Sequence, residues 1–150
     1  MFRVIGIGNP LMGDDGLGIV AVECLRQMEP PPGVEAIDGG TGGLTLLELF
    51  EGAQRVILVD AVDMGKAPGT VVRLALPDLL SVDPALPLSW HAAGVLPALR
   101  LGHELSLLPP LWLFGMQPSR IAPGIGLSPA VAAALPELLA TLLAFSKSAQ

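Results

Sequence analysis

The sequence predicts an α/β fold, a three-layer α/β/α sandwich around a mostly parallel, twisted sheet with one antiparallel strand. Short apolar runs alternate with stretches of helical periodicity along the whole chain. The resulting order, β-α-β-α-β-β-α-β-α, is typical of parallel strands joined by crossover helices. One connection between strands is too short to hold a helix, which predicts the antiparallel strand. With 51% hydrophobic and 15% charged residues, the 150-residue chain is expected to form a single domain, 1–150.

Strands and helices are expected to alternate in the first part of the chain. Residues 3–7, 34–38 and 55–60 are short apolar runs and are predicted to be strands, the clearest being 55–60 (RVILVD). Residues 16–28 are predicted to form a helix, because apolar side chains recur there at spacings of three and four. These side chains belong to Leu17, Val20, Ala21, Cys24, Leu25 and Met28. Residues 43–51 are predicted to form a second, shorter helix.

The second part of the chain carries the expected antiparallel strand. Residues 69–76 (GTVVRLAL) follow a short polar turn and are predicted to run antiparallel to the preceding strand. Residues 92–101 are predicted to form a helix, and residues 111–116 (LWLFGM) a further strand. The last helix is expected over 128–146, with Ser128 as its N-cap and a proline in the first turn.

Composition excludes several classes of partner. The net charge is −6 and the eight Lys and Arg residues are scattered, so neither a nucleic acid nor an anionic membrane surface is expected to bind. The single cysteine, Cys24, permits no intrachain disulfide, which suits a reducing compartment. The most apolar stretch, near the C-terminus, is interrupted by Pro136 and Glu137, and the N-terminus lacks the features of a signal peptide. A cytoplasmic protein that does not enter a membrane is therefore expected.

Unusual residues follow the first three predicted strands. The loops after Ile7, Ile37 and Val59 read GNPLMGDDG, DGGTGG and DAVD. All three carry carboxylates, and two are rich in glycine. In an open α/β sheet, ligands bind outside the carboxyl ends of the strands. The coincidence predicts an active site at this edge of the sheet.

The first loop contains two adjacent acids, Asp14 and Asp15. A dinucleotide-binding loop would read G-x-G-x-x-G, but Leu11 stands at the third glycine position. Two carboxylates would also repel a pyrophosphate, which argues against a nucleotide. One acid is expected to cap the helix that follows, since Asp is favoured there. Capping alone does not require both.

Asp60 and His91 are the candidates for a metal site together with Asp15. An acid at the end of a buried strand costs desolvation unless it is paired or binds a metal. A structural aspartate bonded to loop amides is an equally weighted alternative for Asp60. His91 becomes relevant only if the fold brings it near the two acids. Two carboxylates and an imidazole would suit Ni, Zn, Mn or Fe and leave positions open for substrate or water.

The second loop, Asp38 to Gly43, is too rich in glycine for a generic turn. Its backbone can approach a ligand or a peptide closely. The alternative is a tight connection between strand and helix. From the residues alone, the conclusion is an α/β enzyme or metal-binding domain with a carboxylate-rich site.

A set of sequence blocks allows a more specific interpretation than the single residues do. GIGNPLMGDDGLG, DGGTGG, VILVDAVDMGKAPGTVVRL, WHAAGVLPAL, FGMQP and IGLSPAV occur in this order over nearly the whole chain. With these blocks the sequence resembles the hydrogenase maturation protease family. The resemblance implies an α/β/α sandwich and a hydrolase, an aspartyl-type or metal-dependent endopeptidase. It would recognise nickel in a hydrogenase large-subunit precursor and remove the precursor's C-terminal extension.

The resemblance also assigns roles to residues. Asp15, Asp60 and His91 fall on the family's metal-contacting positions, and some members carry Glu where this chain has Asp15. The nickel would be supplied by the precursor, and another divalent metal would bind the isolated protein. The hypothesis makes Asp15, Asp38 and Asp60 catalytic, with Asp38 or Asp15 as general base.

The glycine-rich loop is expected to hold the substrate backbone. The residues assigned to this role are Gly39, Gly40, Thr41 and Gly42. The protein is expected to act as a monomer in the cytoplasm. Two alternatives stay open: a non-proteolytic nickel-binding maturation chaperone, and a small-ligand or nucleotide-binding module.

Overall fold

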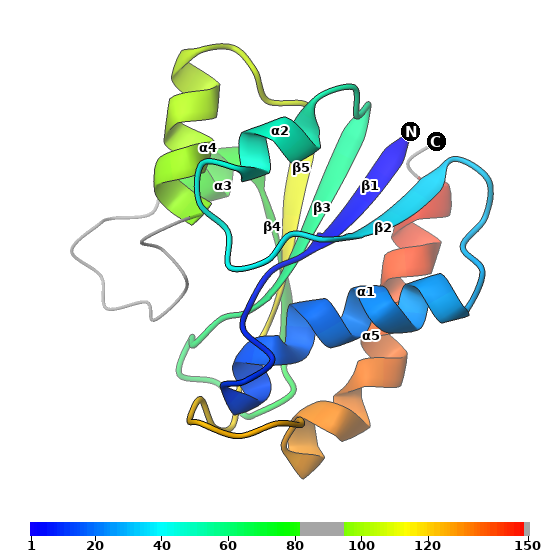
Figure 1. The fold of residues 1–150 in the computed structure, drawn as a ribbon, viewed down its shortest axis with the longest axis vertical. Helices are drawn as coiled ribbons and strands as arrows, with labels where there is room; N and C mark the ends of the chain where they lie inside the picture. Colours follow the sequence, from blue (N-terminus) through cyan, green and yellow to red (C-terminus); the bar gives the residue numbers. More distant parts are fainter. Residues whose placement is uncertain (82–94, 149–150) are drawn as a thin grey trace.

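A computed structural model of the protein describes residues 1–81 and 95–148. A five-stranded sheet in the order β2-β1-β3-β5-β4 forms the middle layer, and helices cover both of its faces (Figure 1). The strands are β1 (Phe2–Gly6), β2 (Val34–Asp38), β3 (Arg55–Ala61), β4 (Val71–Ala75) and β5 (Leu111–Met116). The helices are the 3-10 turn η1 (Gly13–Gly16), α1 (Leu17–Gln27), α2 (Leu46–Phe50), α3 (Leu76–Leu80), α4 (Val95–Glu104) and α5 (Pro129–Ser148). The three-layer architecture confirms the predicted fold class.

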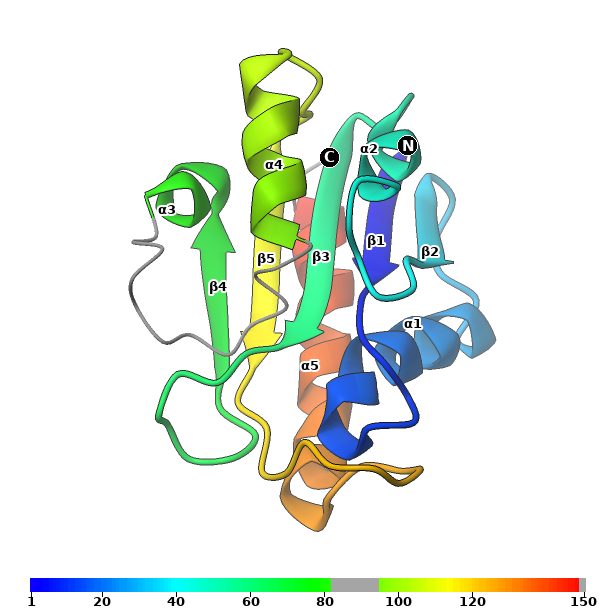
Figure 2. The same ribbon diagram turned by 60° about the vertical axis from the view of Figure 1, so that its left-hand side comes forward.

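Parallel pairing aligns the carboxyl ends of four strands. β1 pairs with both β2 and β3, and Gly6 stands opposite Asp38 on one side and Val59 on the other. β3 in turn pairs in parallel with β5, which places Asp60 opposite Gly115. In Figure 2 the arrowheads of β1, β3 and β5 point to the same end of the molecule. The three loops singled out in the sequence therefore leave the sheet at one edge.

The antiparallel strand is β4, but its neighbour differs from the simplest expectation. β4 runs opposite to β3, as predicted, yet its hydrogen-bonded partner is β5. The segment between β3 and β4 crosses the end of β5, which the chain inserts later between the two strands. A few residues suffice for this crossing, because neighbouring strands lie only about 5 Å apart. The short loop therefore predicts the direction of β4 correctly but does not predict its position in the sheet.

Each face of the sheet has its own apolar core. α1 and α5 pack on one face, and α2, α3 and α4 lie on the other (Figure 1). The start of α1 approaches the sheet so closely that a Cβ atom on Gly6 would lie 2.0 Å from the carbonyl oxygen of Gly18. Glycine at both positions allows this approach. The contact holds the start of α1, which follows the turn η1, against the end of β1.

Two helices differ in detail from the sequence prediction. In α1 the buried face includes Gly18 and Val22, whereas Val20 and Cys24 are half-buried and Met28 is exposed. The buried stripe is displaced by about one position because the glycine side of the helix contacts the strands. The end of the expected strand 69–76 forms α3 instead, because Pro77 stands in its first turn and suits a helix start. The expected helix 92–101 begins outside the described residues and is seen from Val95.

Helix α5 continues through Pro136 and Glu137, which confirms the helix predicted over 128–146; these two residues interrupt the apolar run but not the helix. By length and composition, α5 is apolar enough to cross a membrane, with a mean hydropathy of 1.6, and 28% of that window is buried. The large apolar side chains that pack inward are Val131, Leu138, Leu139 and Leu142. Five of the eleven exposed positions are alanine, which raises hydropathy, and no exposed position carries a large apolar side chain.

Candidate active site

Backbone hydrogen bonds join the three loops at the sheet edge. The amide of Gly8 donates to the carbonyl of Gly40 at 2.8 Å, and the amide of Gly39 donates to the carbonyl of Gly6 at 2.8 Å. The amide of Ile7 donates to the carbonyl of Val59 at 2.9 Å. The first loop is therefore held between the glycine-rich loop on one side and the end of β3 on the other.

Asp60 is fully buried near the end of β3, with an exposed fraction of 0%. Its Oδ1 accepts a hydrogen bond from the amide of Ala61 at 2.8 Å. Gly8 lies against it: a Cβ atom on Gly8 would be 3.8 Å from Oδ1 of Asp60 and 1.9 Å from the carbonyl oxygen of Asp15. The φ angle of Gly8 is +141°, which glycine alone adopts readily. This glycine lets the strand carrying Asp60 and the turn carrying Asp15 meet.

Asp15 is also buried, with 3% of its surface exposed. It belongs to η1, which contacts β3. Its Oδ2 accepts a hydrogen bond from the amide of Asn9 at 3.0 Å, and Oδ1 of Asn9 accepts one from the amide of Leu11. The first loop is thus folded around the Asp15 carboxylate. The structure brings the segments that carry Asp15 and Asp60 together, as the sequence predicted.

Asp14 has a different role from its neighbour. Its carboxylate is 1% exposed and accepts hydrogen bonds from the amides of Ser119, Arg120 and Ser128 and from the Ser128 hydroxyl, at 2.7 to 3.0 Å. Burial alone would raise the pKa of Asp14, but these four hydrogen bonds outweigh it and lower the pKa below its ordinary value of 3.8. Asp14 therefore anchors the loop 119–128 and the start of α5.

Neither acid caps the helix that follows. The N-cap of α1 is Gly16, with no side-chain hydrogen bond, so the expected aspartate cap is wrong. The reason is η1: this turn carries both carboxylates away from the first amides of α1. Ser128 does precede α5 as expected, but its hydroxyl donates to Asp14. Two buried acids beside a helix start are also a poor place for a phosphate, which disfavours the nucleotide alternative.

The described residues test only part of the predicted metal site. His91 lies outside them. Within residues 1–81 and 95–148, no group of three or more His, Cys, Asp or Glu side chains is arranged to hold a metal. Asp15 and Asp60 offer carboxylate oxygens, which suit a divalent cation. A complete ligand set needs a donor from elsewhere, either from this chain beyond the described part or from a bound partner.

The glycine-rich loop begins with an exposed carboxylate. Oδ1 of Asp38 accepts a hydrogen bond from the amide of Gly40 at 2.8 Å, which closes a tight turn. Gly39 is required by packing, because a Cβ atom there would lie 2.6 Å from Ile5. Thr41 is exposed. Part of this loop is therefore the tight connection considered as the alternative, and part presents backbone at the surface.

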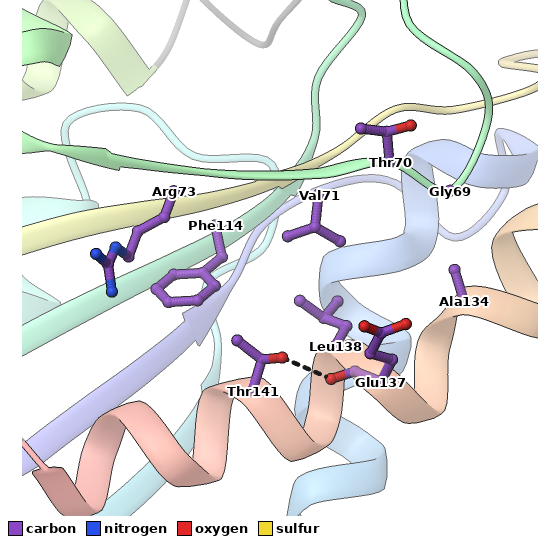
Figure 3. A pocket seen from close by; sticks show the side chains of 9 residues that line it. All are labelled: Gly69, Thr70, Val71, Arg73, Phe114, Ala134, Glu137, Leu138 and Thr141. Atoms are coloured by element: carbon purple, nitrogen blue, oxygen red, sulfur yellow. Dashed lines mark hydrogen bonds between the residues drawn. The ribbon is translucent and has the colours of Figure 1, made fainter.

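A hollow lies away from these loops, between β4 and α5. A cavity of about 650 Å³ separates β4 from α5, and none of the sequence-predicted site residues lines it (Figure 3). Arg73 and Glu137 are its charged side chains, and the Arg73 guanidinium stacks over the ring of Phe145 at 5.2 Å. The lining offers no pair of groups suited to acid–base or nucleophilic chemistry. We therefore place the candidate active site at the loop edge.

The sequence analysis missed the role of Gln117. This residue follows β5 directly, and its side chain is 6% exposed. The amide oxygen accepts hydrogen bonds from the amides of Met64 and Lys66, and the amide nitrogen donates to Asp63. The available signal was a polar residue directly after an apolar strand, as at Asp60. Gln117 organises the loop that follows the Asp60 strand.

Comparison of the sequence with known proteins gives one family. The family model described as hydrogenase maturation protease matches residues 19–145. The hydrogenase 2 maturation protease of Escherichia coli (strain K12) is 37% identical over 145 residues, covering 94% of this chain and 87% of that protein. The hydrogenase expression/formation protein HupD of Rhodobacter capsulatus is 37% identical over 132 residues, covering 86% of this chain. That match spans 63% of the relative, just under two thirds of its length.

Solved structures agree. The hydrogenase maturating endopeptidase HybD from E. coli has a TM-score of 0.84 at 32% identity, covering 99% of this chain and 93% of that chain. The hydrogenase 2 maturation peptidase from a Thaumarchaeota archaeon has a TM-score of 0.70 at 30% identity, covering 95% of both chains. The similarity thus extends over sheet, helices and the loops at the carboxyl edge.

Proposed function

This chain belongs to the hydrogenase maturation protease family, and on that premise we propose that it removes the C-terminal extension of a nickel-loaded hydrogenase large-subunit precursor. The observation that carries the proposal is that two buried aspartates lie against Gly8, Asp15 with its backbone carbonyl oxygen and Asp60 with Oδ1 of its carboxylate. They lie beside a glycine-rich loop at the edge of the sheet. We propose further that the protein works as a monomer in the cytoplasm.

Nickel enters this proposal as part of the substrate. Asp15 and Asp60 would contact the metal already held by the precursor, and His91 would complete the set. Carboxylate oxygens and an imidazole nitrogen are suitable donors for a divalent nickel ion. An enzyme that shares the precursor's metal binds the loaded precursor more tightly than the empty one, because the empty precursor leaves these contacts unmade. This difference in affinity is the source of specificity.

The glycine-rich loop would hold the peptide to be cleaved. The proposed contacts are backbone groups and one hydroxyl, from Gly39, Gly40, Thr41 and Gly42. Gly40 has a φ of +64° and nothing within 4 Å of the position of a Cβ atom, so a peptide can approach its backbone. The loop is bonded directly to Gly8, beside Asp15 and Asp60. A peptide on this loop would therefore pass close to both acids.

Hydrolysis of the peptide bond needs a water that loses a proton as it attacks the carbonyl carbon. Asp38 or Asp15 would accept that proton and deliver it to the leaving amine nitrogen. Nickel acts as a Lewis acid when bound and would polarise the scissile carbonyl or the water. Asp38 is the more accessible of the two acids, because its side chain is exposed whereas Asp15 is buried.

Replacing Asp38 by asparagine separates its two roles. Asparagine keeps the oxygen that accepts the bond from Gly40 but cannot accept a proton at neutral pH. We expect kcat to fall roughly a hundredfold, the lower end of what a general base contributes. The thermal unfolding midpoint should stay within about one degree of the wild type, because a turn whose acceptor is retained loses little stability. If Asp38→Asn has the wild-type kcat and only Asp38→Ala loses activity, Asp38 acts by holding the turn and not as a general base.

The substrate can be tested by intact mass. A nickel-loaded large-subunit precursor should lose a C-terminal fragment on incubation with the protein, and the same precursor without metal should not. An unchanged loaded precursor that still binds would favour the non-proteolytic chaperone. A chain stabilised against heat by a nucleotide, and not by the loaded precursor, would favour the small-ligand module. Cleavage of both precursors would contradict the dependence on nickel but not the peptidase activity.

A further inference from the structure

The buried amide of Gln117 uses all of its hydrogen-bonding groups. Oε1 accepts bonds from the amides of Met64 at 2.6 Å and Lys66 at 3.2 Å. Nε2 donates to Oδ1 of Asp63 at 3.0 Å and to the carbonyl of Pro118 at 3.2 Å. Three of these four partners belong to the segment 63–66. A side chain with both donors and an acceptor is required to hold it in this way.

The backbone beside Gln117 closes the same loop at both ends. The amide of Val62 donates to the carbonyl of Met116 at 2.9 Å. The amide of Gln117 donates to the carbonyl of Thr70 at 2.8 Å, and the amide of Gly69 donates to the carbonyl of Gln117 at 2.9 Å. The chain from β3 to β4 is therefore fixed at its beginning, middle and end by two residues, Met116 at the end of β5 and Gln117 directly after it.

We propose that Gln117 is a positioning residue for peptide cleavage, acting through the loop 62–66 on the end of β3 from which Asp60 projects. The inference rests on the proposed function. The amide of Ala61, which donates to Asp60, is next to Val62, where the held loop begins. A displaced loop would move this donor and with it the carboxylate. Displacement by about 1 Å can cost as much as a hundredfold in rate.

The partnership with Asp63 gives a specific test. In Gln117→Glu a carboxylate replaces the amide, so both donors are lost and two carboxylates face each other. Asp63→Asn removes the repulsion and supplies an amide nitrogen opposite the new carboxylate, at the cost of the bond that Oδ1 of Asp63 accepts from the amide of Gly65. The Met64 and Lys66 amides find an acceptor in either case. The double variant Q117E/D63N should therefore restore much of what Q117E loses.

The experiment measures kcat and KM for cleavage of nickel-loaded precursor by wild type, Q117E, D63N and Q117E/D63N. We expect Q117E to lower kcat about tenfold with KM within about twofold, the pattern of disturbed positioning rather than lost binding. The double variant should recover most of this loss, as residues in direct contact couple strongly. Gln54→Glu is the matched control: this exposed glutamine lies at the far end of the sheet and accepts a bond from the N-terminal amine.

Two outcomes would overturn the proposal. One is a kcat for Q117E equal to that of the wild type. The other is a loss that Asp63→Asn leaves unrepaired. If Q117E fails to fold, Gln117→Met removes all four side-chain hydrogen bonds without adding a charge, and its kcat decides in the same way. Hydrogen exchange of the 62–70 amides measures how firmly the loop is held, independently of activity. Rapid exchange of these amides in the wild type would refute the claim that Gln117 holds the loop in place. Absence of cleavage by the wild type would instead count against the proposed function.

Discussion

Asp60→Asn is expected to abolish cleavage of nickel-loaded precursor and leave the fold intact. Asparagine has nearly the same shape and retains an oxygen to accept the bond from Ala61, so the buried site stays filled. What disappears is the negative charge that the proposal places against the substrate's metal. We expect the rate to fall by about a thousandfold, because even outer-shell partners of metal ligands contribute about 10–100-fold.

Initial cleavage rates at saturating precursor, together with the unfolding midpoint, provide the measurement. Asp78→Asn is a matched control, since Asp78 is an exposed aspartate that also accepts a backbone hydrogen bond, from Ala75. It should cleave at the wild-type rate. Wild-type activity in Asp60→Asn would remove Asp60 from the site and leave it as a structural aspartate bonded to its own loop.

Asp14→Ala is expected to cost stability rather than chemistry. The substitution deprives three backbone amides and one hydroxyl of their acceptor. Buried donors left without a partner cost about 1–3 kcal/mol each, less where water can enter, so we expect the free energy of unfolding at pH 7 to fall by about 3 kcal/mol. Urea unfolding measures it. Ser128→Ala removes one of the four bonds and should cost about 1 kcal/mol. A variant as stable as the wild type would show that the loop 119–128 is held by other contacts.

The effect of Asp14 should depend on pH in one direction. Because the pKa of this carboxyl is lowered in the folded protein, ionisation favours the folded state at every pH above the unfolded value, near 3.8. As the pH falls through the folded pKa, that contribution disappears. The difference in stability between wild type and Asp14→Ala should therefore be constant from pH 5 to pH 7 and shrink below about pH 4. A difference that grows on acidification would have the wrong sign.

Local sequence patterns predicted most of the fold, because strands and helices have distinct apolar periodicities. They also located the carboxyl edge, since a parallel sheet gathers its loops there. The position of β5 between β3 and β4 was not predictable in the same way. It depends on a pairing between residues about forty positions apart, from Val71 with Met116 to Ala75 with Trp112, and the short loop after β3 is compatible with either arrangement.

The site was predictable only in part for a similar reason. Asp14 and Asp15 are adjacent and chemically identical, so no local rule separates them. Their roles are set by partners distant in sequence: Ser119, Arg120 and Ser128 for Asp14, and the end of β3 for Asp15. Gln117 was overlooked because a single glutamine carries no motif of its own. The role of a buried polar side chain depends on its hydrogen-bond partners, and these partners are known only from the folded structure.

The bond between Asp14 and Ser128 spans 114 positions in the sequence. During synthesis, β1 and η1 leave the ribosome long before Ser119 to Ser128 do. The Asp14 carboxylate is therefore solvated by water until its hydrogen-bond donors have been synthesised. Contacts of such long range form late in folding. The turn that carries Asp15 would then acquire its final shape only when the last helix docks. A nascent chain that already contains Asp15, Asp38 and Asp60 would not yet be a competent peptidase.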